Sequence, residues 1–302
     1  MRERGWRLAY PGTVVEFGGV DFVGDPFQRN VGRVGVEAYE VSATDLTTEN
    51  TPRPRTDGVR FGQDYRGGVT HTFTLRARGR TREQAEQLMG AVATAWRGDA
   101  VRGTPDAFAE LTTLQGGVER TMLGRPRLFT PNYDRLAAHE ITAVVTFETT
   151  DDTWLGPEEQ LRIDLRAVSL DGFTMPFTFP LVMSQPSQRA GQIVVGGTLP
   201  TPLVVEVHGP ISNPVVACLG DWSLQLRTSL GAGRVVTLDA RAWRRTITDQ
   251  AGASYAGALA RPGRLSSMVV RPGARQIVLS GQDTSGTAHA VVRWRPLFAG
   301  RK

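Results

Sequence analysis

The chain has 302 residues, of which 40% are hydrophobic and 22% are charged, which predicts about two folded domains and argues against global disorder. No apolar run has the length of a membrane-spanning helix, and residues 1–7 are not followed by the apolar stretch of a signal peptide. We therefore expect a soluble protein that is made in a cytoplasm and does not insert into a membrane.

The basic charge of the chain is concentrated in one part of it. The net charge is +5, and Lys302 is the only lysine, so every other basic residue is an arginine. Residues 191–302 contain 13 basic and 5 acidic side chains, residues 1–50 are net acidic, and residues 51–190 are balanced. The excess is spread over predicted turns and strand faces without interleaved aromatic residues, which argues against nucleic-acid binding.

The first half of the chain alternates between apolar and polar residues over several short stretches. Residues 13–17, 34–41, 71–78 and 141–147 follow this pattern, which predicts β-strands. One helix interrupts them. Thr81 and Gln84 have the spacing of a capping box, and Gly98 is a typical helix end. One apolar face lies between them, formed by Ala85, Leu88, Met89, Val92, Ala95 and Trp96. This order of elements predicts an α+β unit, a sheet or split barrel crossed by one helix.

A long polar stretch separates the second and third of these strands. Residues 44–68 contain several Pro and Gly residues and are predicted to form a long loop. We expect residues 50–68 to form an arm that reaches a neighbouring subunit, because the stretch is polar and has few residues that would pack on themselves. Its four arginines are the candidate inter-subunit residues: Arg53, Arg55, Arg60 and Arg66.

The last part of the chain predicts an antiparallel β-sandwich. Short apolar segments alternate with Gly/Pro turns at residues 203–207, 222–226, 235–238, 243–248, 276–279 and 288–294. We expect a first domain at residues 1–168, closed by a polar strand at 160–167, and a second domain at residues 191–302. The connection at residues 169–190 contains prolines that bar it from a sheet interior, and we expect its residues 175–181 to lie in a groove between the domains.

Catalytic and metal-binding motifs are missing from the sequence. The four histidines, His71, His139, His208 and His289, lack metal-ligand spacing, and exposed strand positions on the polar face explain His71 and His289. Asp151 and Asp152 have no spaced oxygen ligands for calcium around them and predict a solvated turn. The only cysteine, Cys218, excludes an internal disulfide and is expected to be buried. We predict no enzyme activity and no cofactor, although a pair of acids that meet in space leaves a hydrolase open.

Three tryptophans of the second domain are candidates for sugar stacking. Trp222 shares a strand face with Leu224 and Leu226, and the apolar face of the last strand includes Trp294, so both are expected in the core. Trp243 is followed by Arg244 and Arg245 and is left as a possible sugar or partner contact together with these two arginines.

The segments of the second domain, in their order, resemble the second domain of siphophage distal tail proteins. The resemblance begins at residues 198–210 and continues through Asn213-Pro214, the Gly231-Ala232-Gly233 turn, residues 236–239, residues 271–277 and Trp294. In the first half, residues 64–68, 96–99, 104–105 and 124–127 resemble minor tail proteins of phages that infect high-GC Gram-positive bacteria, and residues 173–180 resemble the interdomain stretch of these proteins.

This resemblance implies a structural protein of the virion tail tip, assembled in the host cytoplasm. The N-terminal domains, similar in fold to tail-tube proteins, would form a hexameric ring that continues the DNA channel, while galectin-like sandwiches project outward. The expected partners are other copies of the chain, the tube protein, the tail-tip hub and receptor-binding proteins. DNA would pass through without specific binding, so we expect a channel face without net positive charge. The alternative is a carbohydrate-binding adhesin that uses the second domain, although we expect this sandwich to bind proteins instead of sugars.

Overall fold

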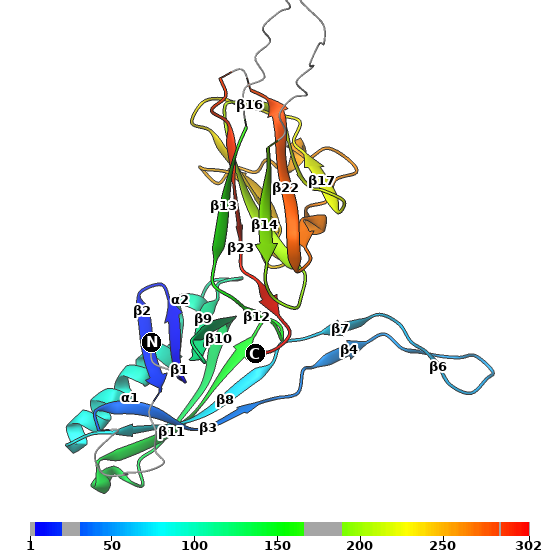
Figure 1. Ribbon diagram of the computed structural model, residues 1–302. Helices are drawn as coiled ribbons and strands as arrows, with labels where there is room; N and C mark the ends of the chain where they lie inside the picture. The colour runs from blue at the N-terminus through cyan, green and yellow to red at the C-terminus, as the bar shows by residue number, and fades with distance from the viewer. Residues whose placement is uncertain (1–3, 20–30, 166–188, 284, 302) are drawn as a thin grey trace, which may run out of the picture. The chain divides into compact units, whose positions relative to one another are not determined.

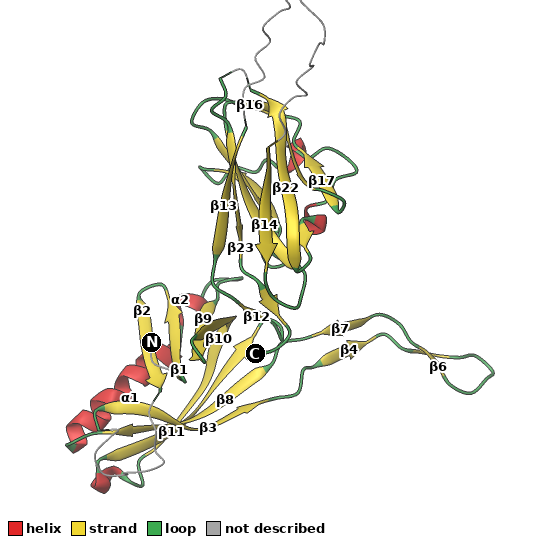
Figure 2. Ribbon diagram, in the orientation of Figure 1, coloured by secondary structure: helices red, strands yellow, loops and turns green. Residues whose placement is uncertain are grey.

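The computed structural model describes residues 4–19, 31–165, 189–283 and 285–301. The chain divides into two compact units. Unit 1 contains Met1–Gly156 and Ala299–Lys302, and unit 2 contains Pro157–Phe298. Both units are built almost entirely from antiparallel strands, with one long helix in unit 1 (Figures 1 and 2). The mainly β fold class with a single long helix, as predicted from the sequence, is confirmed.

Unit 1 is one antiparallel sheet whose strands run in the order β2-β1-β9-β10-β11-β8-β3 (Figure 1). A short strand, β12 (Trp154–Leu155), pairs with β10 beside this order. The bounds of the main strands are β1 (Gly5–Tyr10), β2 (Thr13–Gly18), β3 (Arg33–Val41), β8 (Thr70–Arg78), β9 (Ala109–Gln115), β10 (Val118–Asn132) and β11 (Glu140–Thr149).

The apolar alternation of the sequence determines which face of this sheet is buried. In β8 the side chains of Phe73, Leu75 and Ala77 are fully buried, and they lie opposite the buried Val145, Ala143 and Ile141 of β11. The residues between them point to the opposite face and are partly exposed. A single face therefore contributes to the core, as expected for an antiparallel sheet with one solvated side.

The helix α1 (Arg82–Arg97) covers the buried face. Thr81 is its N-cap, and its hydroxyl oxygen accepts a hydrogen bond from the Gln84 amide at 3.2 Å. The Gln84 side chain in turn accepts from the Arg80 amide at 2.7 Å. The predicted apolar face is buried at Ala85, Met89, Val92, Ala95 and Trp96. The helix ends at Gly98, whose φ of 62° is left-handed, and a short helix α2 (Asp99–Arg102) follows.

The two edge strands of the sheet curl toward each other. A side chain at Gly18 of β2 would lie 3.2 Å from Val36 Cγ2 of β3. The remaining gap is a cavity of about 320 Å³ lined by residues of both strands and by Leu88 and Val92 of α1. The sheet is therefore a split barrel with the helix across it, as the order of elements predicted.

Residues 42–69 between β3 and β8 form an extended hairpin, which we call the arm (Figure 1). Strand β4 (Leu46–Thr48) pairs with β7 (Asp64–Arg66), and β5 (Thr51–Pro52) pairs with β6 (Val59–Arg60). The predicted long loop at residues 44–68 therefore contains two short ladders that were not predicted. The sequence conceals these ladders because each has only two or three residues per strand and neither face is buried.

Unit 2 is a sandwich of two antiparallel sheets. One runs β13-β23-β15-β19-β20 with β21 on β15, and the other runs β14-β22-β16-β17 with β18 on β16. Strand bounds in unit 2 are β13 (Glu159–Asp164), β14 (Arg189–Val195), β15 (Thr201–His208), β16 (Ile211–Cys218), β17 (Trp222–Gln225), β18 (Ser229–Leu230), β19 (Val235–Asp239), β20 (Thr246–Asp249), β21 (Val269–Val270), β22 (Gly273–Gln282), β23 (His289–Trp294) and β24 (Leu297–Phe298).

The two sheets of unit 2 share one core. Leu203, Val205 and Val207 of β15 alternate inward from one sheet, and Ile277 and Leu279 of β22 belong to the same cluster from the other. Cys218 lies in this cluster with 1% exposure, as predicted, and burial raises the pKa of its thiol to about 11. Such a thiol is neutral at physiological pH and is not a nucleophile.

Three segments need correction or lie outside the structure. The predicted strand at residues 160–167 does not close the first unit, because β13 pairs along its whole length with β23 of unit 2. The predicted strand at 243–248 begins only at Thr246. Most of the predicted connection at 169–190, including residues 175–181, lies outside the described residues, and its last two residues begin β14.

Candidate functional site

The root of the arm is fixed to unit 1 by polar contacts. Arg66 Nη1 donates to Asp152 Oδ2 at 2.8 Å, and the Asp152 carboxylate lies in the turn after β11. Across the hairpin, the Gly67 amide donates to the Asp45 carbonyl at 2.7 Å, and the Thr70 amide donates to Ser42 Oγ at 3.0 Å. The arm therefore leaves the sheet in one defined direction.

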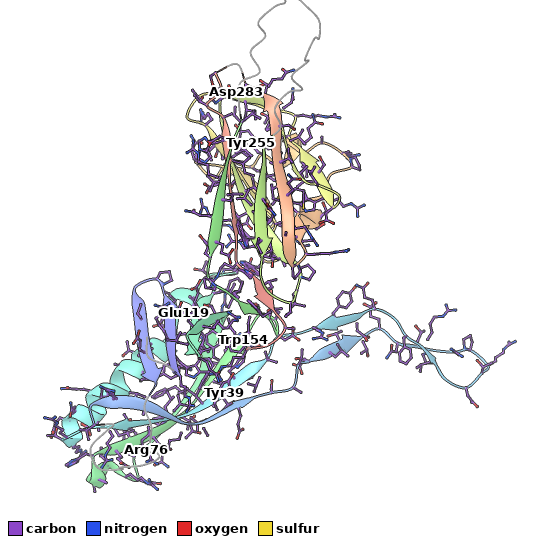
Figure 3. All side chains as sticks on the ribbon, viewed as in Figure 1. Tyr39, Arg76, Glu119, Trp154, Tyr255 and Asp283 are labelled. Atoms are coloured by element: carbon purple, nitrogen blue, oxygen red, sulfur yellow. The ribbon has the colours of Figure 1, made fainter. Side chains whose placement is uncertain are left out.

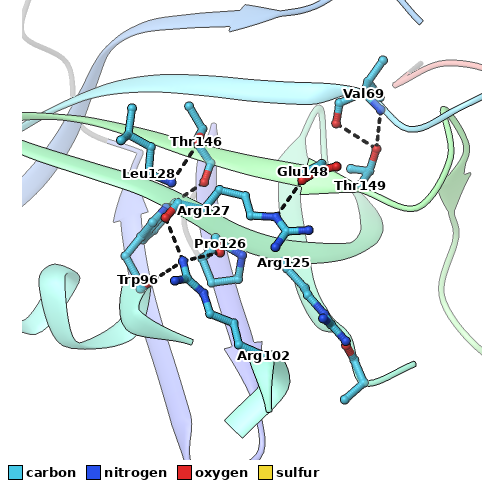
Figure 4. A network of polar contacts seen from close by, with 11 residues as sticks. Val69, Trp96, Arg102, Arg125, Pro126, Arg127, Leu128, Thr146, Glu148 and Thr149 are labelled. Atoms are coloured by element: carbon cyan, nitrogen blue, oxygen red, sulfur yellow. Dashed lines mark hydrogen bonds and ion pairs between the residues drawn. The ribbon is translucent and has the colours of Figure 1, made fainter. Parts of the chain in front are cut away.

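A close backbone approach strengthens this root. A Cβ at Gly68 would lie 2.0 Å from the carbonyl oxygen of Thr149, so only glycine fits there. The hydroxyl of Thr149 accepts from the Val69 amide at 3.0 Å and can donate to the carbonyl of Val69 or Asp151 (Figure 4). Asp151 accepts from Thr153 at 2.9 Å, which confirms the predicted turn at this position.

Aromatic and basic side chains cluster on the sheet near the root of the arm, where Figure 3 labels Tyr39 and Trp154. Tyr39 Oη lies 2.8 Å from Nδ1 of His71, and the Arg301 guanidinium stacks over the rings of Tyr39 and Trp6. Tyr39, His71 and Arg301 line a cavity of about 330 Å³ together with Trp154. The predicted exposed position of His71 is wrong: it shares its strand face with Phe73 and is 1% exposed.

Burial determines the charge state of this cluster. It lowers the pKa of His71 to about 4, with a smaller contribution from the nearby Arg301 cation. It also raises the pKa of Tyr39 to about 12, which Arg301 partly opposes. At neutral pH both rings are therefore uncharged, and Arg301 is the cation beside them. Nε2 of His71 has no hydrogen-bond partner among the described residues.

Beyond its root the arm is exposed to solvent along its length (Figure 3). Arg53, Arg55 and Arg60 are all exposed and form no ion pair within the described part of the chain. Arg66 differs from them because it pairs with Asp152 of its own chain. Of the four arginines predicted to reach a neighbour, three are available for it and one anchors the arm.

The solvated face of the sheet carries its charges in pairs. On the adjacent strands β8 and β11, this face presents Arg76, Arg78, Glu140 and Glu148, whose charges sum to zero, among threonines and Val144. Arg78 pairs with Glu140 at 3.4 Å, and Arg76 pairs with Glu37 of β3. The threonines are Thr70, Thr72, Thr74, Thr142 and Thr146. The part of this face formed by β8 and β11 is neutral and is a second candidate surface.

Two arginines near this face are tied to the backbone or to glutamate (Figure 4). Arg127 Nε donates to Glu148 Oε2 at 2.6 Å. Arg102 Nη2 donates to the carbonyl oxygens of Pro126 and Arg127 at 2.8 and 2.7 Å, where β10 has a register irregularity. Arg102 thereby joins the end of the helical segment to the sheet. Its role is structural, and no local pattern in the sequence indicates it.

In unit 2, Trp243 and its neighbours form a polar turn. The Arg241 guanidinium lies 5.9 Å from the centre of the Trp243 ring and also donates two close hydrogen bonds to Asp239. These hydrogen bonds to the buried Asp239 raise the pKa of Arg241. Arg244 lies 3.9 Å from the same carboxylate, and Arg245 is exposed. One face of Trp243 is thus occupied by a guanidinium.

The other tryptophans and the remaining candidate ligands are accounted for by packing. Trp294 is 6% exposed and Trp222 packs partly buried against the core, as predicted. His208 and His289 stack at 4.2 Å between ring centres. Among the described residues no group of His, Cys, Asp and Glu is arranged to hold a metal ion. In the same part of the chain, no helix combines the length and apolarity needed to cross a membrane.

Comparisons with known proteins identify the fold. No protein-family model matches the sequence, and no curated protein matches it significantly. The Dit protein of phage SPP1, described as a paradigm of the hub adsorption apparatus in phages that infect Gram-positive bacteria, matches with a TM-score of 0.57. The match covers 97% of this chain and 99% of that chain at 10% identity. A chain from the phage P2 baseplate, in its activated conformation with calcium, matches with a TM-score of 0.50, covering 97% of both chains at 11% identity.

At this level of identity the likeness is one of fold. Because nearly all of both chains is covered, the fold is shared across both units. The resemblance to siphophage distal tail proteins, which the sequence motifs indicated, is therefore confirmed in the three-dimensional structure.

Proposed function

We propose that this chain is a distal tail protein of a siphophage, a structural component of the virion tail tip that is assembled in the host cytoplasm. The observation that carries the proposal is the match along almost the full length of the SPP1 Dit protein. In this role the protein joins the tail tube to the tail-tip hub and to receptor-binding proteins. Its function depends on shape and self-association instead of on catalysis.

The ring of this proposal contains six copies, joined in part by the arm. The hairpin has no core of its own, and isolated two-stranded hairpins are marginally stable in water. A neighbouring subunit would supply the missing contacts. Arg53, Arg55 and Arg60 are the arginines assigned to it, because no carboxylate of their own chain pairs with them in the described residues.

The channel of the ring is assigned to the solvated face of β8 and β11. A lining that bound phosphates would retard DNA, because each basic contact adds salt-dependent affinity. On this face Arg76 and Arg78 are paired with Glu37 and Glu140, so their charge is already compensated. DNA would pass this surface without specific binding.

No enzyme activity or cofactor is included in the proposal. The sharpest catalytic candidate, Cys218, is a buried thiol whose pKa is raised. The carbohydrate-binding adhesin is not favoured, because Arg241 covers one face of the only ambiguous tryptophan, Trp243. We expect the sandwich to dock other tail proteins.

Native mass spectrometry of the purified full chain tests the ring. We expect a complex of six times 32.9 kDa, together with labelling of tail tips when particles are stained with an antibody to this protein. A protein that stays a single copy, is missing from infectious particles and cleaves host-wall polysaccharide would contradict the proposal.

The channel assignment has its own test in phage particles. Thr74→Arg adds an unpaired cation to the centre of the β8 face, whereas Thr74→Ser keeps a small hydroxyl there. We expect the arginine variant to assemble normally and to eject DNA more slowly, with the delay shrinking as salt rises. Ejection at the unaltered rate in both variants would exclude this face from the channel.

A further inference from the structure

The arm exposes apolar side chains as well as arginines. Phe61 is 79% exposed, and Leu46, Val59 and Tyr65 of the same hairpin are 44% to 53% exposed. Single exposed apolar residues are common on protein surfaces. Their concentration on a hairpin without a core indicates a segment whose apolar side chains are covered in the assembly.

A cavity of suitable size lies on the other side of unit 1, between α1 and the ends of β10 and β11. Its volume is about 290 Å³. Met89 and Ile141 form a buried apolar floor, Tyr133 lies at the rim with 54% exposure, and nothing lies within 4 Å of a Cβ at Gly90. An apolar cavity of about 150 Å³ can bind benzene, so a phenylalanine ring fits here.

The arm cannot fill this cavity within one subunit. The arm connects the end of β3 to the beginning of β8, where Val41 pairs with His71. Ile141 of the cavity pairs with Ala77, near the other end of β8. At about 3.4 Å per residue, the two positions are about 20 Å apart along the strand. The arm also extends away from α1 (Figure 1). A second copy is therefore the only source of this arm.

The charges beside the two surfaces are complementary. Residue Arg60, directly before Phe61, is exposed and has no ion pair in the described residues. Glu86 lines the cavity, and among the described residues its carboxylate pairs only with Arg82, an exposed i,i+4 partner at 3.0 Å. Exposed ion pairs of this kind are weak, so Glu86 can readily accept a guanidinium from another chain.

We propose that Phe61 of one subunit inserts into the α1/β10 cavity of the next subunit and that Arg60 pairs there with Glu86. The inference rests on the proposed ring and specifies one of its contacts. One subunit contributes the arm and the next contributes the α1/β10 cavity. Because these two surfaces differ, the contact is head-to-tail, and its repetition around an axis closes a ring.

Substitutions at Gly90 test the contact without weakening the fold. Gly90→Leu fills the mouth of the cavity, and Gly90→Ala is the matched control, since both remove a glycine from a helix interior and favour the helix. We expect Gly90→Leu and Phe61→Ala each to raise the dissociation constant between subunits about thirtyfold, as for a central aromatic contact. Gly90→Ala is expected to leave it unchanged in native mass spectrometry.

A cross-link gives a second measurement. A chain with Phe61→Cys and Ala93→Cys is oxidised mildly at a concentration far above the dissociation constant of the Phe61→Ala variant. Neighbouring subunits should then be joined into a covalent ladder, whereas Phe61→Cys with Val194→Cys should give none. The contact would be overturned, and the proposed ring left intact, by three results together. These are rings of the unaltered chain, rings of the Gly90→Leu variant and no covalent ladder from the Phe61→Cys, Ala93→Cys chain. Unaltered chain that never forms rings would instead overturn the proposed function, and the contact with it.

Discussion

The arm and the solvated sheet face of unit 1 both carry arginines, but among the described residues these arginines are paired within the chain on the sheet face and unpaired at the outer part of the arm. On the sheet, Arg76 and Arg78 are compensated by glutamates of the same chain. On the arm, Arg53 and Arg60 have no such partner in the described residues, and Phe61 is exposed beside them. The sheet face is thus complete within one subunit, whereas the arm has the character of half an interface.

The physical reason for this difference is the backbone beneath the side chains. Strands of a sheet hold side chains of adjacent strands about 5 Å apart, so opposite charges find each other within the chain. The arm has only two short ladders and no third strand. Its side chains have few neighbours, and only another molecule can supply them.

Removal of the arm is the change with the largest expected effect. The Gly67 amide already donates to the Asp45 carbonyl at 2.7 Å, so residues 46–66 can be deleted with little strain at the junction. We expect the complete loss of rings in native mass spectrometry and a circular dichroism spectrum that remains that of a folded β protein. Stable rings of the deleted chain would show that the arm is not an interface.

Acid should weaken the region where arm and sheet meet. Because the pKa of His71 is lowered to about 4 in the folded state and is about 6.5 when unfolded, only the unfolded chain binds the proton between these values. Stability is therefore full above about pH 6.5 and falls by up to about 3 kcal/mol as the pH drops to about 4.

Hydrogen exchange of the β8 amides at several pH values measures this loss within unit 1. His71→Gln should flatten the dependence, because glutamine does not titrate. His139→Asn is the control, since His139 is exposed and its left-handed φ of 60° suits asparagine. A slope that survives in His71→Gln would assign the acid sensitivity to other groups.

The connection from the helical segment to the sheet should contribute more than an exposed ion pair. Arg102→Ala removes hydrogen bonds to the carbonyls of Pro126 and Arg127, and we expect a loss of about 2 kcal/mol in the free energy of unfolding. Arg97→Ala removes only an exposed pair with Asp99 and should cost less than about 0.5 kcal/mol. Urea unfolding followed by tryptophan fluorescence compares the two; equal losses would contradict this role for Arg102.

The smallest expected effect separates the arginines of the arm itself. The Arg66 side chain is 71% exposed in its pair with Asp152, so Arg66→Ala should lower monomer stability by about 0.5 kcal/mol. Arg53→Ala should not change it, because its expected partner is in another subunit. The unfolding temperatures of the two variants are compared at a concentration where subunits are separate. An equal shift for Arg66→Ala and Arg53→Ala would contradict the assignment of Arg66 as the anchor of the arm and of Arg53 as a contact to another subunit.

Much of the fold was predictable from periodicity and caps. The alternation in β8 and β11, the Thr81 cap and the Gly98 end are local signals, since each depends on residues within one element. Two strands with a proline in their interior were missed. β16 contains Pro214 and β10 contains Pro126, and both strands have register irregularities beside these residues, where a proline disturbs the ladder least.

What the sequence determined by itself is therefore the local pattern: strands, one helix, a polar arm with four arginines and the absence of familiar catalytic motifs. The tertiary structure decided which unit receives β13, that His71 is buried beside Tyr39, and that Arg66 meets Asp152. Each of these depends on residues tens of positions apart in the chain. Local propensity and periodicity carry no information about such pairs, because only chain folding brings them together.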